Sequence, residues 1–458
     1  MSRSGASTSR YGRSAALLTG AVGAAGLLTY AFFALASHAL DREEYGRIVV
    51  LWSVMFIAIS VLFRPVEQLL SRTIAELDTH GQPTGHVLRT AAGIQLGIAA
   101  AFTVAAFALR GPIQDDLFDG DALFFWALIA SVLGFAAAFF ARGYLAGSHR
   151  FGLYAALVLL DAVARMAFAL VVAVGLADGV DPIAIGIALA PLIGLLALAW
   201  LGRAQRAPEA LAASQGGPPG GEAAPEFTLS QGTGFAAAVL VIMLSEQVFL
   251  NSGPLFARVE ADTAAAGFIF NVLMVVRAPV VLFQAVATSL LPHLTRMRSR
   301  GDRAGGAAFR RSVRVTLLAV AAFTALTLLA VAAAGPALMQ LAFGEKFEYD
   351  RPGLLIVAAG MGLYLSATTL NQAVLAQAQA RRAALCWAAC ALALLAWYTV
   401  PAVEVFRRVE VGFASASALL CLLLALAYRR PRGRPEDAPE PGSPRELELR
   451  LAAADDAA

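Results

Sequence analysis

Twelve stretches of mostly apolar residues recur along this chain, and their length constrains its fold more than any other feature. A helix needs about 20 such residues to cross the hydrocarbon core of a bilayer. The stretches lie near 14–39, 47–70, 87–109, 122–147, 152–177, 182–202, 233–257, 264–291, 312–334, 352–378, 383–402 and 411–428. We therefore predict an all-α integral membrane protein of about twelve transmembrane helices.

The composition agrees with a chain whose solvent is lipid. Of the 458 residues, 59% are hydrophobic and 15% are charged, and the mean hydropathy is +0.69. A soluble domain carries about 25% charged residues, so this chain has too few polar groups to cover a water-facing surface. The first apolar stretch, which follows Arg13, is longer than the roughly 7–15 residues of a signal-peptide core. We interpret it as a retained spanning helix.

Arginines are distributed unequally between the two sets of loops. The two tails and the loops that follow the second, fourth, sixth, eighth and tenth stretches hold 24 Arg. The loops on the opposite side hold 8 basic and 16 acidic residues. Positively charged segments remain on the cytoplasmic side of a membrane. The asymmetry predicts that both termini are cytoplasmic.

A segment rich in Gly, Pro and Ala divides the chain almost evenly. It has no apolar periodicity, which is typical of a flexible linker. We predict an N-terminal six-helix lobe at 1–203, a cytoplasmic linker at 204–231, a C-terminal six-helix lobe at 232–430 and a disordered cytoplasmic tail at 431–458. The lobes are weakly similar in sequence, since 144–158 can be aligned with 374–388 and 63–66 with 283–286. Both lobes begin on the same side, so the repeats would be parallel.

Ionisable side chains inside the apolar stretches are the first candidates for function, because each costs about 2.5–3.5 kcal/mol at a helix centre. Six occur: Arg64, Glu67, Asp161, Arg165, Glu246 and Arg277. One hypothesis pairs them as buried salt bridges along or between helices. The other places Arg64, Arg165 and Arg277 around a hydrated cavity, where guanidinium groups bind a phosphate-bearing cargo. Glu67, Asp161 and Glu246 then serve ion coupling or charge pairing, and the sequence leaves both hypotheses open.

Amide side chains add a second set of candidates for the cavity. These are Gln247 and Asn251 in the seventh stretch, Gln284 in the eighth, and Asn371 and Gln372 in the tenth. Amides suit sugar hydroxyl groups, but they also form hydrogen bonds between helices without any ligand.

The cysteines predict no metal site. Cys386 and Cys390 are four residues apart, but no His or carboxylate accompanies them as a structural metal site requires. Cys421 also lies in an apolar stretch, where free Cys packs as a small hydrophobe. We expect no cofactor, no metal, no catalytic residue and no nucleic-acid partner.

Four segments resemble polysaccharide flippases of the Wzx type. They are "LDREEYGRIVVLWSV" (40–54), "RGYLAGSHRFGLYA" (142–155), "VVRAPVVLFQAVATSLLPHLTRM" (275–297) and "LAFGEKFEYDR" (341–351). The resemblance implies the fold that these flippases share with MATE-type exporters, in which two six-helix bundles face a central cavity and alternate in access. It also implies a bacterial inner-membrane protein that flips polyprenyl-diphosphate-linked oligosaccharide to the outer leaflet, beside polysaccharide polymerases and glycosyltransferases.

Three other functions were weighed against this one. A MATE-like drug exporter would favour a carboxylate-rich, aromatic-lined cavity, and a lipid II flippase usually has fourteen helices rather than twelve. A membrane glycosyltransferase would use an acidic outer loop, which Asp115 and Asp116 resemble. The outer loops are too short for an acceptor-binding domain, so these acids are interpreted as solvated loop residues.

Overall fold

The computed structural model describes residues 3–79, 82–209, 229–277, 303–401 and 403–429, and over these ranges the chain is helical without a strand. The N-terminal half contains α1 (Arg3–Ala39), α2 (Arg42–Leu62), α3 (Arg64–Thr79), α4 (Gly85–Ala108), the short π-helix η1 (Pro112–Leu117), α5 (Ala122–Gly147), α6 (Phe151–Ala173) and α7 (Asp181–Glu209). The C-terminal half contains α8 (Leu229–Glu260), a helix at Thr263–Arg277, α10 (Arg303–Phe343), the 3₁₀ turn η2 (Glu345–Phe347), α11 (Arg351–Ala376), α12 (Ala380–Tyr398) and α13 (Val405–Arg429). The predicted all-α fold is confirmed.

The helices of the described residues account for all twelve predicted stretches. Eleven spans are long and apolar enough to cross a bilayer, and the helix Thr263–Arg277 begins the remaining stretch. The chain is therefore a multi-pass membrane protein. The helix α7 extends to Glu209 and α8 begins at Leu229, whereas the rest of the predicted linker and the predicted tail lie outside the described residues.

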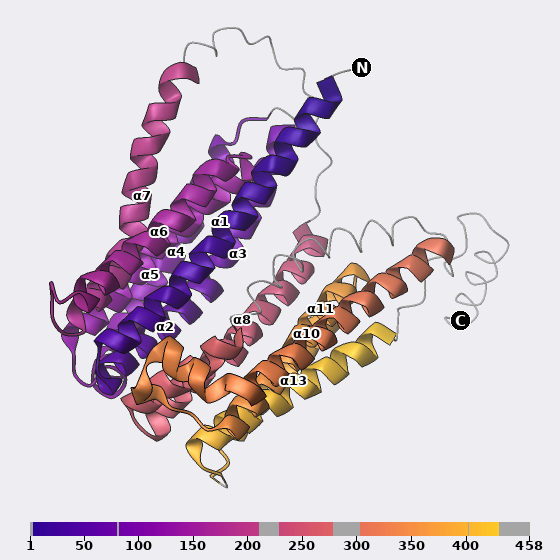
Figure 1. Ribbon diagram of the computed structural model, residues 1–458. Coiled ribbons are helices and arrows are strands. Elements are labelled where there is room, and N and C mark those ends of the chain that lie inside the picture. Colours follow the sequence, from indigo (N-terminus) through magenta and orange to yellow (C-terminus); the bar gives the residue numbers. More distant parts are fainter. Residues whose placement is uncertain (1–2, 80–81, 210–228, 278–302, 402, 430–458) are drawn as a thin grey trace, which may run out of the picture.

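Two bundles stand side by side in Figure 1. In the N-terminal lobe α6 packs on α1 and α7, while α5 packs on α3 and α7; in the C-terminal lobe α11 packs on α10 and α13, while α12 packs on α8 and α13. Between the lobes α2 packs against α8, and α1 touches α10. The bundles diverge toward the end that carries the start of α1 and the end of α7 (Figure 1).

One short corner occurs in both lobes with the same backbone geometry. It joins α5 to α6 and α11 to α12, and the two copies are 229 residues apart, from Gly147 to Ala376. Each contains one residue in the left-handed region, His149 at φ 55° and Ala378 at φ 57°. The backbone hydrogen bonds also match, since Arg150 N donates to Leu145 O as Gln379 N donates to Val374 O. This shared corner supports the parallel repeat that the sequence suggested.

The predicted stretch 47–70 is interrupted near its centre. The helix α2 ends at Leu62 and α3 begins at Arg64, with Phe63 between them. Pro65 explains the break, because its ring nitrogen cannot donate to a carbonyl one turn earlier and its ring crowds that turn. Arg64 therefore lies at a joint, where its side chain is exposed.

The last helix begins six residues earlier than predicted, and so it carries three more charges into the bundle. Within α13, Arg407 contacts Glu410 at 2.8 Å, and Arg408 donates to the backbone carbonyl of Val403 at 2.9 Å. The hydroxyl of Tyr349, which lies before α11, donates to Glu410. Burial, followed by the neighbouring Glu410 carboxylate, raises the pKa of Tyr349, so this phenol remains a donor. Buried charge is tolerated here because each group has a partner.

Two glycines allow α5 to lie directly on α3. A methyl group on Gly143 would lie 2.9 Å from the carbonyl oxygen of Glu67, and one on Gly147 would lie 2.7 Å from the carbonyl oxygen of Ser71. Small residues four apart are a common means of close helix packing in membranes. The pair fixes α3, and hence Glu67, against the N-terminal lobe.

We expect Gly147→Leu to lower the stability of the protein by about 1–3 kcal/mol, because the added side chain overlaps backbone that cannot move aside cheaply. Thermal unfolding of the purified protein in one detergent measures the change. Gly97→Leu on α4 is the matched control, since nothing lies within 4 Å of its added methyl position. Equal unfolding temperatures for the two variants would contradict the close packing of α3 on α5.

Candidate functional site

Polar contacts join the two lobes at the end opposite to their divergence. The Tyr45 hydroxyl donates to Asn271, and the Arg258 guanidinium lies 2.6 Å from the Asp119 carboxylate. Lys346 donates to the carbonyl of Leu40 at 2.6 Å. We name this set the closed end; it comprises Leu40, Tyr45, Gly46 and Asp119 of the N-terminal lobe and Arg258, Thr263, Asn271 and Lys346 of the C-terminal lobe.

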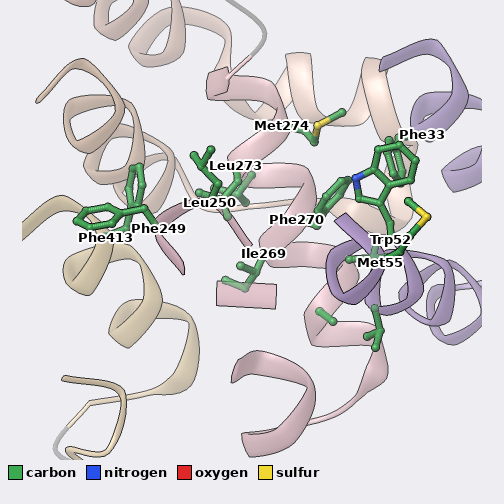
Figure 2. Packing of buried hydrophobic residues seen from close by; sticks show 14 of the residues in the cluster. Phe33, Trp52, Met55, Phe249, Leu250, Ile269, Phe270, Leu273, Met274 and Phe413 are labelled. Carbon is green, nitrogen blue, oxygen red and sulfur yellow. The ribbon is translucent and has the colours of Figure 1, made fainter. Parts of the chain in front are cut away.

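An aromatic layer lies next to the closed end. The ring centroids of Phe33 and Phe270 are 4.5 Å apart across the lobes, and Trp52 lies 5.1 Å from Phe33. Figure 2 shows Phe270 directed at Phe33 and Trp52, with Met274 on the next turn of the same helix. All four side chains are buried. The layer belongs to a hydrophobic core that the two lobes share.

Two arginines lie where the lobes begin to part, and we call Arg64 and Arg277 the central arginines. Arg277 is fourteen residues from Thr263, so it lies about 21 Å along the helix from the closed end, well inside a core about 30 Å thick. It is half-buried and lies within electrostatic range of Tyr30 in the other lobe. Arg64 is exposed and lies within electrostatic range of Tyr364 in the C-terminal lobe. The guanidinium of Arg64 is therefore accessible to solvent or to a ligand.

Neither central arginine forms a contact ion pair among the described residues. The sequence suggested Arg64 with Glu67 and Arg277 with Glu246. Instead the Tyr154 hydroxyl donates to Glu67 at 2.9 Å, and the Tyr364 hydroxyl donates to Glu246 at 3.2 Å. A neutral hydroxyl satisfies each carboxylate, which leaves both guanidinium groups available to an anion.

The third predicted arginine is placed differently. Arg165 contacts Asp161 at 3.0 Å, and its guanidinium lies 5.0 Å from the ring of Trp52. Both charged side chains are buried, with 7% and 4% of their residue surfaces exposed. Arg142 lies 4.0 Å from the same Asp161 carboxylate. The pair therefore fits the salt-bridge hypothesis, and the geometry does not place Arg165 beside the central arginines.

Most of the predicted amides bond within the C-terminal lobe. Asn251 donates to Gln247 at 3.0 Å, and Asn371 accepts from the Trp387 indole at 3.1 Å; all of these side chains are buried. Gln372 is half-buried, and Gln284 lies outside the described residues. The bond between Asn251 and Gln247 lies within α8, whereas the bond between Trp387 and Asn371 joins α12 to α11.

Sequence reasoning missed several groups around the central arginines. Tyr30, Tyr154 and Tyr364 lie in apolar stretches. The sequence does not show whether the hydroxyl group of such a tyrosine contacts a charged side chain or whether the ring is only part of the hydrophobic packing. Arg142 had a signal, because it opens the quoted segment 142–155, but it was not singled out. Tyr45, Gly46 and Lys346 likewise lie in quoted segments, and the structure places all three at the closed end.

No group of three His, Cys, Asp or Glu side chains that could hold a metal ion occurs in the part of the chain that the structure describes. Cys386, Cys390 and Cys421 are free thiols.

The solved structures similar to this chain include MATE-type transporters of the MOP superfamily, and the chain has their fold. A variant of the Vibrio cholerae MATE transporter VcmN matches with a TM-score of 0.60 and 17% identity, over 93% of this chain and 97% of that one. An inward-facing multidrug resistance MATE transporter matches with a TM-score of 0.63 and 12% identity, over 88% and 94% of the two chains.

A third similar structure is a MOP superfamily transporter of Pyrococcus furiosus, described as having a binding pocket of reverse polarity that suggests a different function. It matches with a TM-score of 0.59 and 13% identity, over 92% of this chain and 94% of that one. No protein-family model and no curated protein matches the sequence. At these identities the likeness establishes the fold, and the cargo has to be argued from the site.

Proposed function

We propose that this protein carries a polyprenyl-diphosphate-linked oligosaccharide from the cytoplasmic to the outer leaflet by alternating access. The observation that supports this cargo is the pair of central arginines, one from each lobe, with no contact ion pair among the described residues. A guanidinium remains charged at any physiological pH and matches phosphate oxygens with two parallel hydrogen bonds.

The orientation follows from charge. We infer from the arginine-rich loops that the termini are cytoplasmic, which directs the diverging end of the lobes to the cytoplasm and the closed end outward. This arrangement corresponds to an inward-open state that receives cargo from the side where lipid-linked sugars are assembled. The bilayer accommodates the polyprenyl chain, while the diphosphate and sugar occupy the space between the lobes.

A multidrug exporter is the second candidate, and Glu246 is the observation that favours it. Its carboxylate is half-buried at the level of Arg277 and bonded to Tyr364, and an acid beside an aromatic ring suits an organic cation. The two functions differ in the sign of the cargo charge, so they can be separated directly.

Reconstituted protein is expected to move a fluorescent polyprenyl-diphosphate-linked sugar between leaflets of liposomes, because the central arginines stabilise the diphosphate as it crosses the core. Reduction of the fluorophore by an impermeant quencher measures the fraction exposed on the outside. Liposomes that contain the protein with both central arginines replaced by Ala are the control. Flipping of a neutral glycolipid at the same rate as the diphosphate-linked sugar would contradict a cargo selected by its charge.

Expression in a drug-sensitive bacterial host is expected to leave the inhibitory concentrations of cationic drugs unchanged, since a site with two guanidinium groups that form no contact ion pair among the described residues repels a cation. A several-fold rise that is lost in Glu246→Gln would instead support the exporter.

A further inference from the structure

We propose that the closed end is a releasable latch, in which Lys346, Asp119 and Gly46 hold the lobes in the state described here and must separate for the other state to form. This inference rests on the alternating access of the proposed function. It concerns the regulation of that cycle and not the choice of cargo.

Lys346 is the single lysine of the chain, and it links the lobes through the end of a helix. Its amine lies 2.6 Å from the carbonyl oxygen of Leu40 and 3.5 Å from that of His38, immediately around the last residue of α1. The last carbonyls of a helix lack partners within it and form the negative end of its dipole. The ammonium group of Lys346 in the C-terminal lobe thus donates to carbonyl groups at the end of α1 in the N-terminal lobe.

The local fold holds this amine in place. The turn η2 follows Gly344, whose φ of 88° is unfavourable for other residues. Phe347 is fully buried, with its ring centroid 5.0 Å from that of Tyr45 and 5.0 Å from that of Phe268. Lys346 is therefore presented to α1 on a short, anchored turn, and any separation of the lobes at this end withdraws it.

Asp119 supplies the second link. One carboxylate oxygen lies 2.6 Å from Arg258, and the other accepts the Thr263 hydroxyl at 3.0 Å. Asp119 has a φ of 56°, a left-handed conformation that Asp and Asn tolerate better than other residues with side chains. About half of its side chain is exposed, so water can replace both partners when the lobes move apart.

Gly46 sets how closely the lobes approach. A methyl group there would overlap the carbonyl group of Thr263, and Gly267 similarly faces Tyr45. The backbone of α2 thus rests against the start of the helix Thr263–Arg277. Any larger residue at position 46 would push the two lobes apart at the closed end, and we call such a residue a wedge.

These three links are of a kind that conformational exchange can break. A cation at a helix end shifts an equilibrium about two- to fivefold, and an exposed ion pair shifts it by a similar factor or less. Lys346 and Asp119 are partly exposed, whereas Gly46 and the aromatic layer are buried. Removing one link should therefore change the populations of the two states without unfolding either lobe.

The single lysine makes the latch measurable on the protein itself. An impermeant amine-reactive ester added to protein in nanodiscs labels only Lys346 and the terminal amine, which peptide mass spectrometry separates. We expect Asp119→Asn, which keeps the left-handed backbone but removes the charge, to increase the labelling rate of Lys346 about two- to fivefold. Gly46→Leu should increase it further, because the wedge acts on the backbone.

Two controls match these changes. Asp115→Asn removes an acid from η1 that forms no ion pair among the described residues, and Gly97→Leu adds the same bulk on α4 at a position with nothing within 4 Å. Each should label at the wild-type rate. If Gly46→Leu does not fold, Asp119→Asn alone carries the test. Unchanged labelling in a folded Asp119→Asn protein, judged by its unfolding temperature, overturns the latch.

The labelling experiment tests the latch independently of the proposed function, because it is carried out without cargo. Faster labelling in the latch variants together with no flipping of the diphosphate-linked sugar would support the latch and reject the cargo. Flipping of the diphosphate-linked sugar by the wild type, together with equal labelling of Lys346 in every variant, would support the cargo and reject the latch.

Discussion

Replacing Arg277 with alanine is expected to reduce export of the lipid-linked sugar by about 10- to 100-fold, the loss that follows removal of one charged hydrogen-bonding group from an anion. Arg64→Ala should have a similar effect, and the double variant should be inactive. Restoration of cell-surface polysaccharide in a flippase-deficient strain measures export. Arg277→Lys tests geometry as well as charge, because an ammonium cannot bind two phosphate oxygens as the guanidinium fork does.

The control for these variants is Arg89→Ala, on an exposed position of α4 with no contact to the other lobe among the described residues. It should export at the wild-type rate. Each variant must also reach the membrane at the wild-type amount, which immunoblotting of membranes verifies. Full export by the Arg64→Ala, Arg277→Ala double variant would reject the proposed anion site.

Asp161→Ala is expected to destabilise the protein by about 3–5 kcal/mol, because Arg165 would remain charged in the interior without its partner. The double change Asp161→Leu with Arg165→Met should recover most of that loss, since a buried ion pair and well-packed apolar side chains of similar size have similar stability. Thermal unfolding of the purified proteins in one detergent measures both.

The same variants distinguish a structural role for the Asp161–Arg165 pair from a direct role in transport. If the double variant is as stable as the wild type and still exports sugar, the pair serves the N-terminal lobe alone. If it is stable but inactive, Arg165 takes part in the cycle despite its burial, as the sequence hypothesis had it. An unfolding temperature for Asp161→Ala equal to that of the wild type would contradict the ion pair itself.

Much of the fold was predictable because the bilayer imposes a length on every helix. The apolar stretches gave the order of the helices and the all-α class, and only local chemistry altered the bounds. Pro65 divides the second stretch at Phe63, and paired charges let α13 begin at Val405. Pro65 is visible in the sequence, and so is the spacing of Arg407 and Glu410, but the bond from Tyr349 to Glu410 spans 61 residues.

The candidate site was predictable only in part, because helical spacing relates neighbours on one helix. It correctly paired Asp161 with Arg165 at i, i+4. It could not show that Glu67 accepts a hydrogen bond from Tyr154 instead of pairing with Arg64, since Glu67 and Tyr154 are 87 residues apart. The bond between Tyr45 and Asn271 spans 226 residues and crosses the lobes. Contacts of that range depend on how the bundles dock, which no periodicity in either sequence segment encodes.

The matching corners at Gly147 and Ala376 bear on how a chain of this kind can arise. A unit that crosses the membrane an even number of times returns to the face where it started. A tandem copy then needs only a stretch of water-soluble chain to follow it, and its corners fall on the same face as those of the original. With an odd number of crossings the second copy would have been inverted, and its corner would have emerged on the opposite face.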